Sequence, residues 1–256
     1  MAKVNSLSQY INITTTIQTE WSNQYKDEMI FPWFRGHNSI MHQLVPGLYR
    51  DKNTANNEYD YRYDFKYKAF PFLSEAYKSP ENEWDWYFLM QHYGLATRLL
   101  DWSEGSLVAL FFALNYKTDD SNPCVWMLNP FEFNKIFHGK DEFFDNDDAE
   151  CKKYLHPLWS DKKLPQQPIA IAAPHNSKRI TAQKGCFTIH GSDTQALEAY
   201  LELKPHLKRI DINYGFIEDI TDQLTTAGIT ESTLFPDLNG LSREVKNYWR
   251  MGRGAS

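Results

Sequence analysis

The hydrophobic pattern of the chain is strongest in the segment SLVALFFALNY, residues 106–116. Apolar side chains would lie on nearly every side of a helix with this sequence, so the pattern predicts the central buried helix of the fold. Short apolar runs in CVWMLNP, PIAIAAP and HLKRIDIN predict buried strands. The pattern also predicts a short strand over Met29–Phe34, interrupted by Pro32 and closed by Gly36, so we expect Arg35 to point out from its end.

Helical patterns lie around these strands. Three of them predict one N-terminal helix and two C-terminal helices: Ser6–Glu28, Phe216–Thr226 and Leu238–Arg250. Another helix is expected up to Gly94, because Ser79 is a favourable N-cap residue and Pro80 suits the first helical position. Its last turn then carries Gln91 and His92.

Other segments have less regular patterns. Aromatic residues at positions 59, 61, 63, 65 and 67 alternate with charged residues, which favours a strand, although a helix could also bury most of the rings. We expect RITAQKGCFTIHG to be a strand in which Gly185 allows a bend, and DTQALEAYLEL to be a helix. Asp101 or Ser103 stands where it could cap the buried helix.

These elements do not alternate in a regular βαβ rhythm, which favours an α+β fold. We expect a single domain with a central mixed or antiparallel sheet, a buried helix and flanking helices. A chain of 256 residues is long enough for one sizeable core. The expected organisation is an N-terminal helical segment (1–28), a main domain (29–241), and a C-terminal helix and tail (242–256).

Composition and charge argue against several classes of function. The net charge of −6 argues against a protein that coats nucleic acid through its bulk charge, although a local basic pocket stays open. The three cysteines form no CxxC pair and the eight histidines lack ligand spacing, so we expect neither a disulfide framework nor a structural metal. The N-terminal sequence lacks a signal-peptide pattern, and no apolar run could span a bilayer. We therefore expect a cytoplasmic protein without membrane contact.

Five polar residues in QHYGLATRLLD form the main candidate site. They are Gln91, His92, Thr97, Arg98 and Asp101, and they stand between two apolar segments. In the functional interpretation, they meet the N-terminus of the buried helix, which favours an anion, and His92 or Asp101 acts in catalysis. In the structural interpretation, Arg98 pairs with Asp101, Asp101 caps a helix, and His92 is a hydrogen-bonded core residue.

Two further stretches carry candidate residues. In WFRGH, Arg35 could grip a phosphate or carboxylate beside Gly36 while Trp33 or Phe34 stacks on a flat ring, or it could simply pair with a carboxylate. In KRITAQKG, Arg179 and Gln183 lead into a strand. The amide of Gln183 could hold a substrate or satisfy buried backbone groups.

The stretches FRG, QHYGLATRLLDWSEGSLVALFFA, RITAQKGCFTIHG and LFPDLNGL together resemble the FRG domain family. The resemblance spans roughly Phe31 to Leu241, which makes the main domain FRG-like. The sequence departs from the family pattern at two positions, because the pattern has proline where Ala96 stands and threonine where Ser103 stands. The positions that the family pattern marks are Phe34, Arg35, Gly36, Gln91, His92, Gly94, Thr97, Arg98, Leu99, Leu100, Asp101, Trp102, Arg179, Gln183 and Gly185.

An aromatic residue followed by Arg-Gly also resembles the first motif of ADP-ribosyltransferases, in which the arginine holds a phosphate of NAD. A split α+β architecture would suit that resemblance. The usual glutamate on a late strand has no match here, and Gln183 is its nearest equivalent. This departure leaves the catalytic carboxylate unassigned unless Asp101 or His92 takes the role.

The resemblances imply an NAD-dependent ADP-ribosyltransferase-like enzyme or NAD glycohydrolase, in the toxin or phage-defence setting of many FRG domains. NAD would be the substrate, and a protein or nucleic acid could be the acceptor. Arg35 and Arg98 would then grip the pyrophosphate, while Trp33 or Tyr93 would stack on a ring of the dinucleotide. The alternative is a non-catalytic module that recognises a nucleotide, RNA or a peptide through the same pocket.

Overall fold

A single antiparallel sheet forms the centre of the computed structural model, which describes residues 3–24, 30–73, 80–115, 121–156, 163–172 and 178–250. The strand order is β4-β5-β2-β1-β3-β6, and every neighbouring pair is antiparallel. The strands are β1 (Trp33–His37), β2 (Leu99–Ser103), β3 (Cys124–Leu128), β4 (Ile169–Ile171), β5 (Gly185–Ile189) and β6 (Leu207–Asp211). This sheet and the surrounding helices confirm the predicted α+β class.

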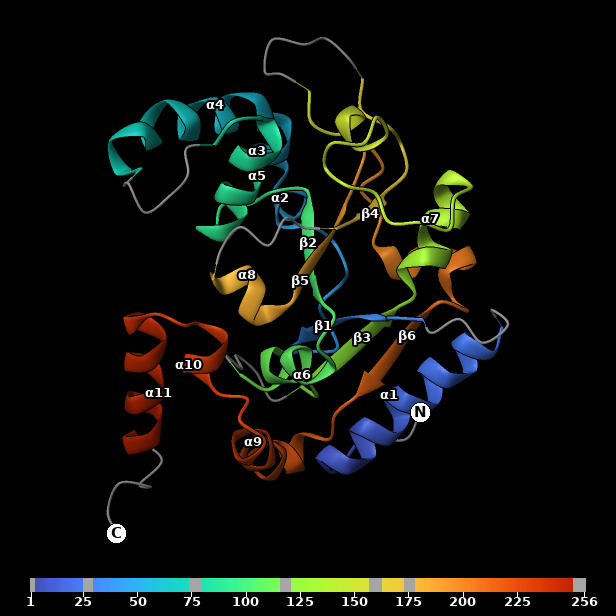
Figure 1. The fold of residues 1–256 in the computed structure, drawn as a ribbon, viewed down its shortest axis with the longest axis vertical. Coiled ribbons are helices and arrows are strands. Elements are labelled where there is room, and N and C mark those ends of the chain that lie inside the picture. The colour runs from blue at the N-terminus through green and yellow to red at the C-terminus, as the bar shows by residue number, and fades with distance from the viewer. Residues whose placement is uncertain are drawn as a thin grey trace.

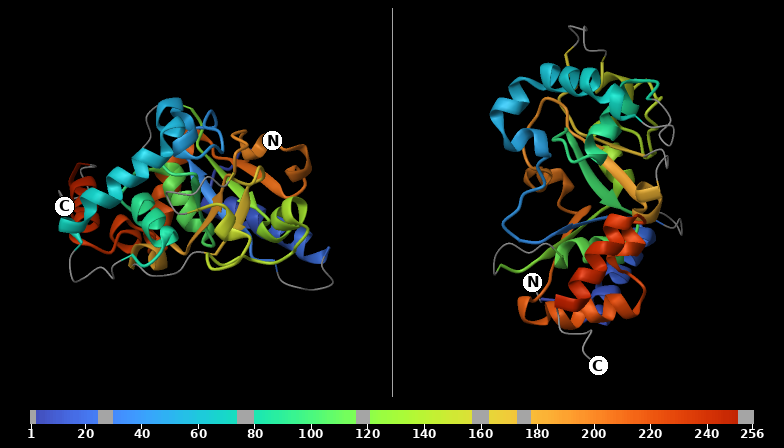
Figure 2. Two further views of the ribbon diagram at one scale, coloured as in Figure 1. Left: turned by 90° about the horizontal axis from the view of Figure 1, so that it is seen from above. Right: turned by 90° about the vertical axis from the view of Figure 1, so that its left-hand side faces the viewer.

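Two groups of helices lie at opposite ends of the molecule (Figure 1). One end carries α2 to α5 and the other carries α9 to α11, as the side view also shows (Figure 2). The α-helices are α1 (Leu7–Asn23), α2 (Gly47–Arg50), α3 (Lys52–Asn56), α4 (Glu58–Ala69), α5 (Glu83–His92), α6 (Ser106–Leu114), α7 (Pro130–His138), α8 (Lys178–Gln183), α9 (Ile217–Thr226), α10 (Glu231–Leu234) and α11 (Leu238–Arg250).

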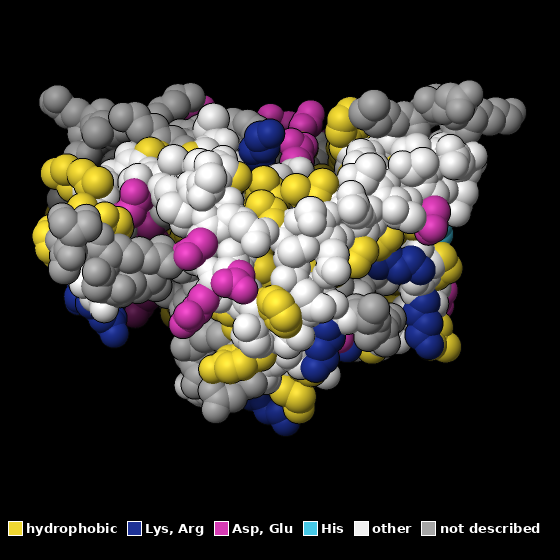
Figure 3. Space-filling model, turned by 90° about the horizontal axis from the view of Figure 1, so that it is seen from below, with side chains coloured by type: hydrophobic (Ala, Val, Ile, Leu, Met, Phe, Trp, Pro, Cys, Tyr) yellow, Lys and Arg dark blue, Asp and Glu magenta, His cyan; other side chains and the backbone are white. Residues whose placement is uncertain are grey.

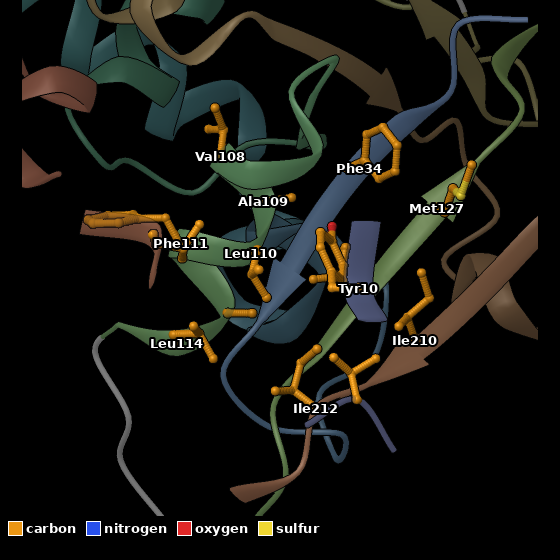
Figure 4. Close-up of a cluster of buried hydrophobic side chains, with 14 of the residues drawn as sticks. Tyr10, Phe34, Val108, Ala109, Leu110, Phe111, Leu114, Met127, Ile210 and Ile212 are labelled. Carbon is orange, nitrogen blue, oxygen red and sulfur yellow. The ribbon is translucent and has the colours of Figure 1, made fainter. Parts of the chain in front are cut away.

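The predicted buried helix is α6, and it packs directly on β1. A Cβ atom at Gly36 would lie 2.0 Å from the carbonyl oxygen of Ala109 and 2.5 Å from the backbone nitrogen of Ala113. Because only glycine fits there, helix and strand touch through their backbones. Figure 4 shows the core around this contact, in which Phe34 of β1 and Tyr10 of α1 lie near the side chains of α6.

The alternating aromatic segment forms the helix α4, so the predicted strand is wrong. Glu58 and Asp60 lie in its first turn and Lys66 and Lys68 in its last, which is the charge order that a helix dipole favours. Helical spacing then divides the rings between two faces. Tyr61 and Phe65 pack against a buried cluster, whereas the side chains at 59, 63 and 67 are exposed.

Other predictions were partly wrong. Residues 99–103 form a strand, and α6 begins after Gly105, so neither Asp101 nor Ser103 caps it. Lys178–Gln183 is a helix before β5, and the segment at 197–203 forms only two short 3-10 turns. The predicted cap Ser79 lies outside the described residues, and α5 begins after Asn82, whose side chain accepts a hydrogen bond from the Asp85 amide.

The surface carries both signs of charge. Figure 3 shows one face, on which acidic and basic side chains are interspersed with hydrophobic ones. Among the helices of the described residues, none has both the length and the apolar character needed to cross a membrane.

Candidate functional site

The central sheet splits between β1 and β2. Their pairing register contains one residue pair, Phe34 with Ser103, whereas β1 pairs with β3 through five pairs and β2 with β5 through five. Beyond Phe34 the two strands separate. The backbone N–H and C=O groups that would continue the hydrogen-bond ladder between them can therefore pair with other groups.

A pocket of about 620 Å³ opens at this split. Such a volume is within the range typical of sites for nucleotides and drug-sized ligands. Eight of the residues that we predicted for the site line it: Phe34, Arg35, Gly36, Gln91, Thr97, Asp101, Arg179 and Gln183. Residues from β1, β2, α5 and α8, which are far apart in the sequence, therefore meet in one cavity.

Arg35 crosses the gap between the separated strands. Its Nη1 donates a hydrogen bond of 2.6 Å to the backbone carbonyl of Asp101, and its Nε donates one of 3.1 Å to Nε2 of His37. The Asp101 carboxylate is 3.7 Å from Nη1. Burial lowers the pKa of Arg35, the charge of Asp101 opposes that shift and the charge of Arg50 adds to it. The guanidinium is thus fixed by groups that are mainly neutral.

His37 holds Arg35 in this position. Its Nδ1 lies 3.2 Å from the carbonyl oxygen of His42, which is satisfied when Nδ1 carries the proton and Nε2 accepts from Arg35. Burial, followed by the charge of Arg35, lowers the pKa of His37 to about 3. His37 is therefore a neutral hydrogen-bond acceptor at physiological pH.

A chain of hydrogen bonds positions Asp101, the only carboxylate among the described residues that line the pocket. The Gln91 amide donates a hydrogen bond of 2.8 Å to Asp101 Oδ2, and Thr97 Oγ1 donates to Gln91 Oε1. The Asp101 side chain is 56% exposed, so a ligand can reach it. Gly94, with φ of +81°, ends α5 in the left-handed conformation and lets the chain turn from Gln91 towards β2.

Arg179 and Gln183 of α8 form another wall. Nη1 of Arg179 lies 3.4 Å from the His92 carbonyl, and its guanidinium stacks 4.7 Å from the centre of the Phe235 ring. The side-chain amide of Gln183 donates to the Leu234 carbonyl at 3.1 Å. α8 therefore joins the pocket to α10 through both of these side chains.

Arg98 does not line the pocket. Its side chain is 1% exposed, and Nε lies 3.0 Å and 3.1 Å from the two carboxylate oxygens of Glu58. Its other nitrogens donate to the carbonyls of His190 and Tyr154, at 2.9 Å and 2.6 Å. Burial alone would lower the pKa of Arg98, but Glu58 raises it above its ordinary value. The expected pairing with Asp101 is also wrong, and the role of Arg98 in gripping pyrophosphate is withdrawn.

Three more predicted residues lie outside the pocket lining. Trp33 is 1% exposed and stacks on Phe143, with ring centres 5.5 Å apart, so it is a core residue. Tyr93 is exposed at the end of α5, with its ring edge-to-face against His92. Burial, with a further contribution from the charge of Arg179, lowers the pKa of the His92 imidazole. The backbone carbonyl of His92 lies 3.4 Å from Nη1 of Arg179, which lines the pocket.

The structure adds residues that sequence reasoning missed. Among them are His37, Asn38, His42, Arg50, Phe112 and Asn115. His37 ends the WFRGH strand on the same sheet face as Arg35, and the two-residue spacing could have indicated it. Arg50 ends α2, and nothing in the surrounding GLYRDKN distinguishes it from an ordinary surface arginine.

Potential metal ligands are not gathered in one place within the described part of the chain. The described residues contain no group of three or more His, Cys, Asp or Glu side chains that could hold a metal ion. All three cysteines, Cys124, Cys151 and Cys186, are free and buried.

Comparisons with known proteins identify one family. The model of the FRG domain matches residues 32–122, which include Arg35, Gln91 and Asp101. The match ends before the later stretches, at residues 179–191 and 234–241, that also resembled the family. Comparison with curated proteins finds no match, and comparison with solved structures finds none either. The comparisons therefore identify an FRG domain over residues 32–122 of the chain.

Proposed function

We propose that this protein is an ADP-ribosyltransferase-like enzyme or NAD glycohydrolase that uses the pocket at the split of the sheet. The observation that carries the proposal is the charge of this pocket. Among the described residues that line it, Arg35, Arg50 and Arg179 stand against one carboxylate, Asp101, although the whole chain has a net charge of −6. A cationic pocket in an acidic protein selects an anionic ligand.

The reaction type comes from the resemblance of Phe34–Gly36 to the first motif of ADP-ribosyltransferases. The separation of β1 from β2 agrees with the split architecture expected of such an enzyme. In this proposal Arg35 donates to a phosphate oxygen of NAD, and its hydrogen bonds to His37 and the Asp101 carbonyl keep it oriented for that contact.

The chemical step is cleavage of the bond between nicotinamide and the ribose C1′. The bonding electron pair leaves with nicotinamide, and positive charge develops on the ribose. Asp101, positioned by Gln91, is the carboxylate that could stabilise this charge. Water or an acceptor hydroxyl then bonds to C1′ and releases its proton. Gln183, as an amide, cannot accept that proton as a base, so its contribution would be to hold the substrate.

The proposed setting is cytoplasmic. Three free cysteines, all buried, are compatible with a reducing compartment. An enzyme that consumes NAD would fit the toxin or phage-defence role suggested for many FRG domains.

The test is release of nicotinamide from NAD by purified protein, with and without cell lysate. Arg35→Met should lower turnover by about 100-fold or more, the loss typical when a preorganised electrostatic donor is removed. Arg250→Met is the matched control, because Arg250 is an exposed arginine at the end of α11 and does not line the pocket. Asp101→Asn tests the carboxylate in the same assay.

Release by the unsubstituted protein and by Arg250→Met, but not by a folded Arg35→Met protein, would support the proposal. A requirement for lysate would indicate a macromolecular acceptor. If no nicotinamide is released under either condition, or if Arg35→Met is fully active, the proposal is wrong.

A recognition module is the second candidate, and the exposed face of α4 favours it. Tyr59, Tyr63 and Tyr67 follow one another at intervals of four residues and are 50% to 71% exposed. The rings of Tyr63 and Tyr67 stack at 6.1 Å with an interplanar angle of 11°. Such a row of rings could stack on bases of single-stranded RNA. Binding of RNA without turnover, weakened by Tyr63→Ser, would support this candidate.

A further inference from the structure

We infer that Arg50 and Arg35 together form a diphosphate-binding subsite in this pocket, with Arg50 as the cation that sequence reasoning did not identify. This inference rests on the proposed function for the identity of the natural ligand, but it can be tested without turnover. The ligand class is a molecule with two linked phosphates, such as ADP-ribose or inorganic pyrophosphate.

Arg50 is placed to meet a ligand. It is exposed at the last position of α2 and lines the same pocket as Arg35. Its Nε donates a hydrogen bond of 2.9 Å to the Val45 carbonyl, which fixes the side chain without neutralising it. The two terminal nitrogens of its guanidinium make no hydrogen bond to a described residue, so they can bind a phosphate.

The acidic groups near Arg50 are engaged elsewhere. Asp51, the next residue, caps α3 and accepts hydrogen bonds from the amides of Asn53 and Thr54. Asp101 is the carboxylate in the pocket lining, and it is held by Gln91 and lies beside Arg35. Arg50 therefore adds positive charge to the pocket that no described carboxylate pairs with directly.

The two guanidinium groups act on each other through space. The charge of Arg50 lowers the pKa of Arg35 and also that of His37, so the three groups share one electrostatic environment. Neutral His37 provides no compensating negative charge. Two like charges in one cavity repel each other, and an anion with two phosphates between them relieves that repulsion.

Arg35 keeps donors available for such an anion. Its Nε is used by His37, and one Nη1 hydrogen is used by the Asp101 carbonyl. A guanidinium has five N–H donors, so the two Nη2 hydrogens remain for a phosphate oxygen, whereas Nη1 also lies 3.7 Å from the Asp101 carboxylate. One phosphate can then bind Arg35 while the second binds Arg50.

The experiment is calorimetric titration of the full chain with ADP-ribose and inorganic pyrophosphate, compared with AMP and orthophosphate. Arg35→Met and Arg50→Met should each weaken binding of the two diphosphates by about 10-fold or more, as expected for loss of a charge-assisted hydrogen bond. Arg50→Met should change binding of AMP by much less, because a single phosphate can be held by Arg35. Arg250→Met should bind the two diphosphates as tightly as the unsubstituted protein does. Arg50→Lys tests whether a single positive charge at this position is enough to bind the phosphate.

The outcomes separate this inference from the proposed function. Diphosphate binding that needs both arginines, without release of nicotinamide from NAD, would support the subsite and reject the proposed reaction. Nicotinamide release that depends on Arg35 but is unchanged in Arg50→Met, with unchanged ADP-ribose affinity, would overturn the subsite and leave the reaction standing. Absence of any diphosphate binding, or equal loss of AMP and ADP-ribose affinity in Arg50→Met, would also overturn it.

Discussion

Arg35 and Arg98 are both positions that the FRG pattern marks, 63 residues apart in the chain, yet the structure gives them opposite surroundings. Arg98 is 1% exposed and has a carboxylate, Glu58, as its partner. Arg35 is 18% exposed in its side chain and is held by a neutral histidine and a backbone carbonyl, with the nearest carboxylate oxygen at 3.7 Å. The partner of an arginine, more than its neighbours in sequence, therefore decides whether its charge serves the fold or a ligand.

Loss of Arg98 should destabilise the fold most. Arg98→Met should lower the free energy of unfolding by about 3–5 kcal/mol, because Glu58 would remain largely buried without its partner. Chemical denaturation followed by tryptophan fluorescence measures this loss. The double substitution Arg98→Met with Glu58→Gln removes both charges and should recover part of it. A loss below about 1 kcal/mol for Arg98→Met would mean that the pair does not support the fold in this way.

An intermediate effect should come from His37, the neutral partner of Arg35. Its pKa is about 3 in the folded protein and ordinarily 6.5, so below pH 6.5 the unfolded chain binds the proton and the folded protein does not. His37 thus stabilises the fold fully above pH 6.5 and loses that contribution as the pH falls towards 3. Between pH 7.5 and pH 5 the loss is about 2 kcal/mol.

The measurement is the free energy of unfolding at several pH values for the unsubstituted protein and for His37→Gln. Other histidines with lowered pKa values, such as His190 at about 4, contribute to both proteins and cancel in the difference. The pH dependence should be shallower in His37→Gln. Identical slopes would show that His37 is not held neutral in the folded protein.

The smallest expected effect on stability belongs to Arg35 itself. Arg35→Met removes hydrogen bonds to His37 and to the Asp101 carbonyl, but both acceptors border a pocket that water can enter. The free energy of unfolding should therefore change by about 1 kcal/mol or less. Thermal unfolding of Arg35→Met and Arg98→Met, measured side by side, compares the two losses of stability. A loss as large as that of Arg98→Met would remove the distinction between the two arginines.

Much of the fold follows from local pattern. The continuous apolar sequence of α6, the strands β3 and β6, and the helix that ends with Gln91 and His92 were predicted correctly. The helix α4 was wrongly predicted as a strand. A period-two alternation of rings is typical of a strand, but it also places some of the rings on one face of a helix. Its helical form depends on tertiary contacts, such as the ion pairs of Arg62 and Lys66 with Glu83, at 2.7 Å and 2.6 Å.

The pocket was predictable to the extent that its residues are close in sequence. Gln91, Thr97 and Asp101 lie within eleven positions, and their hydrogen-bonded chain follows from that spacing. The partner of Arg98, by contrast, is 40 positions upstream, on a helix that had been predicted as a strand. Arg50 joins the pocket only because α2 folds back towards the split, which no local signal indicates.

The buried cysteines have a practical consequence for following this protein with spectroscopic labels. Burial raises the pKa of Cys124 and of Cys151 to about 12, and that of Cys186 well above its ordinary value. Thiol-directed dyes react with exposed thiolates, so these three side chains are protected in the folded state. A cysteine introduced at an exposed position such as Tyr93, beside the pocket, can therefore carry a single fluorophore without removal of the natural cysteines.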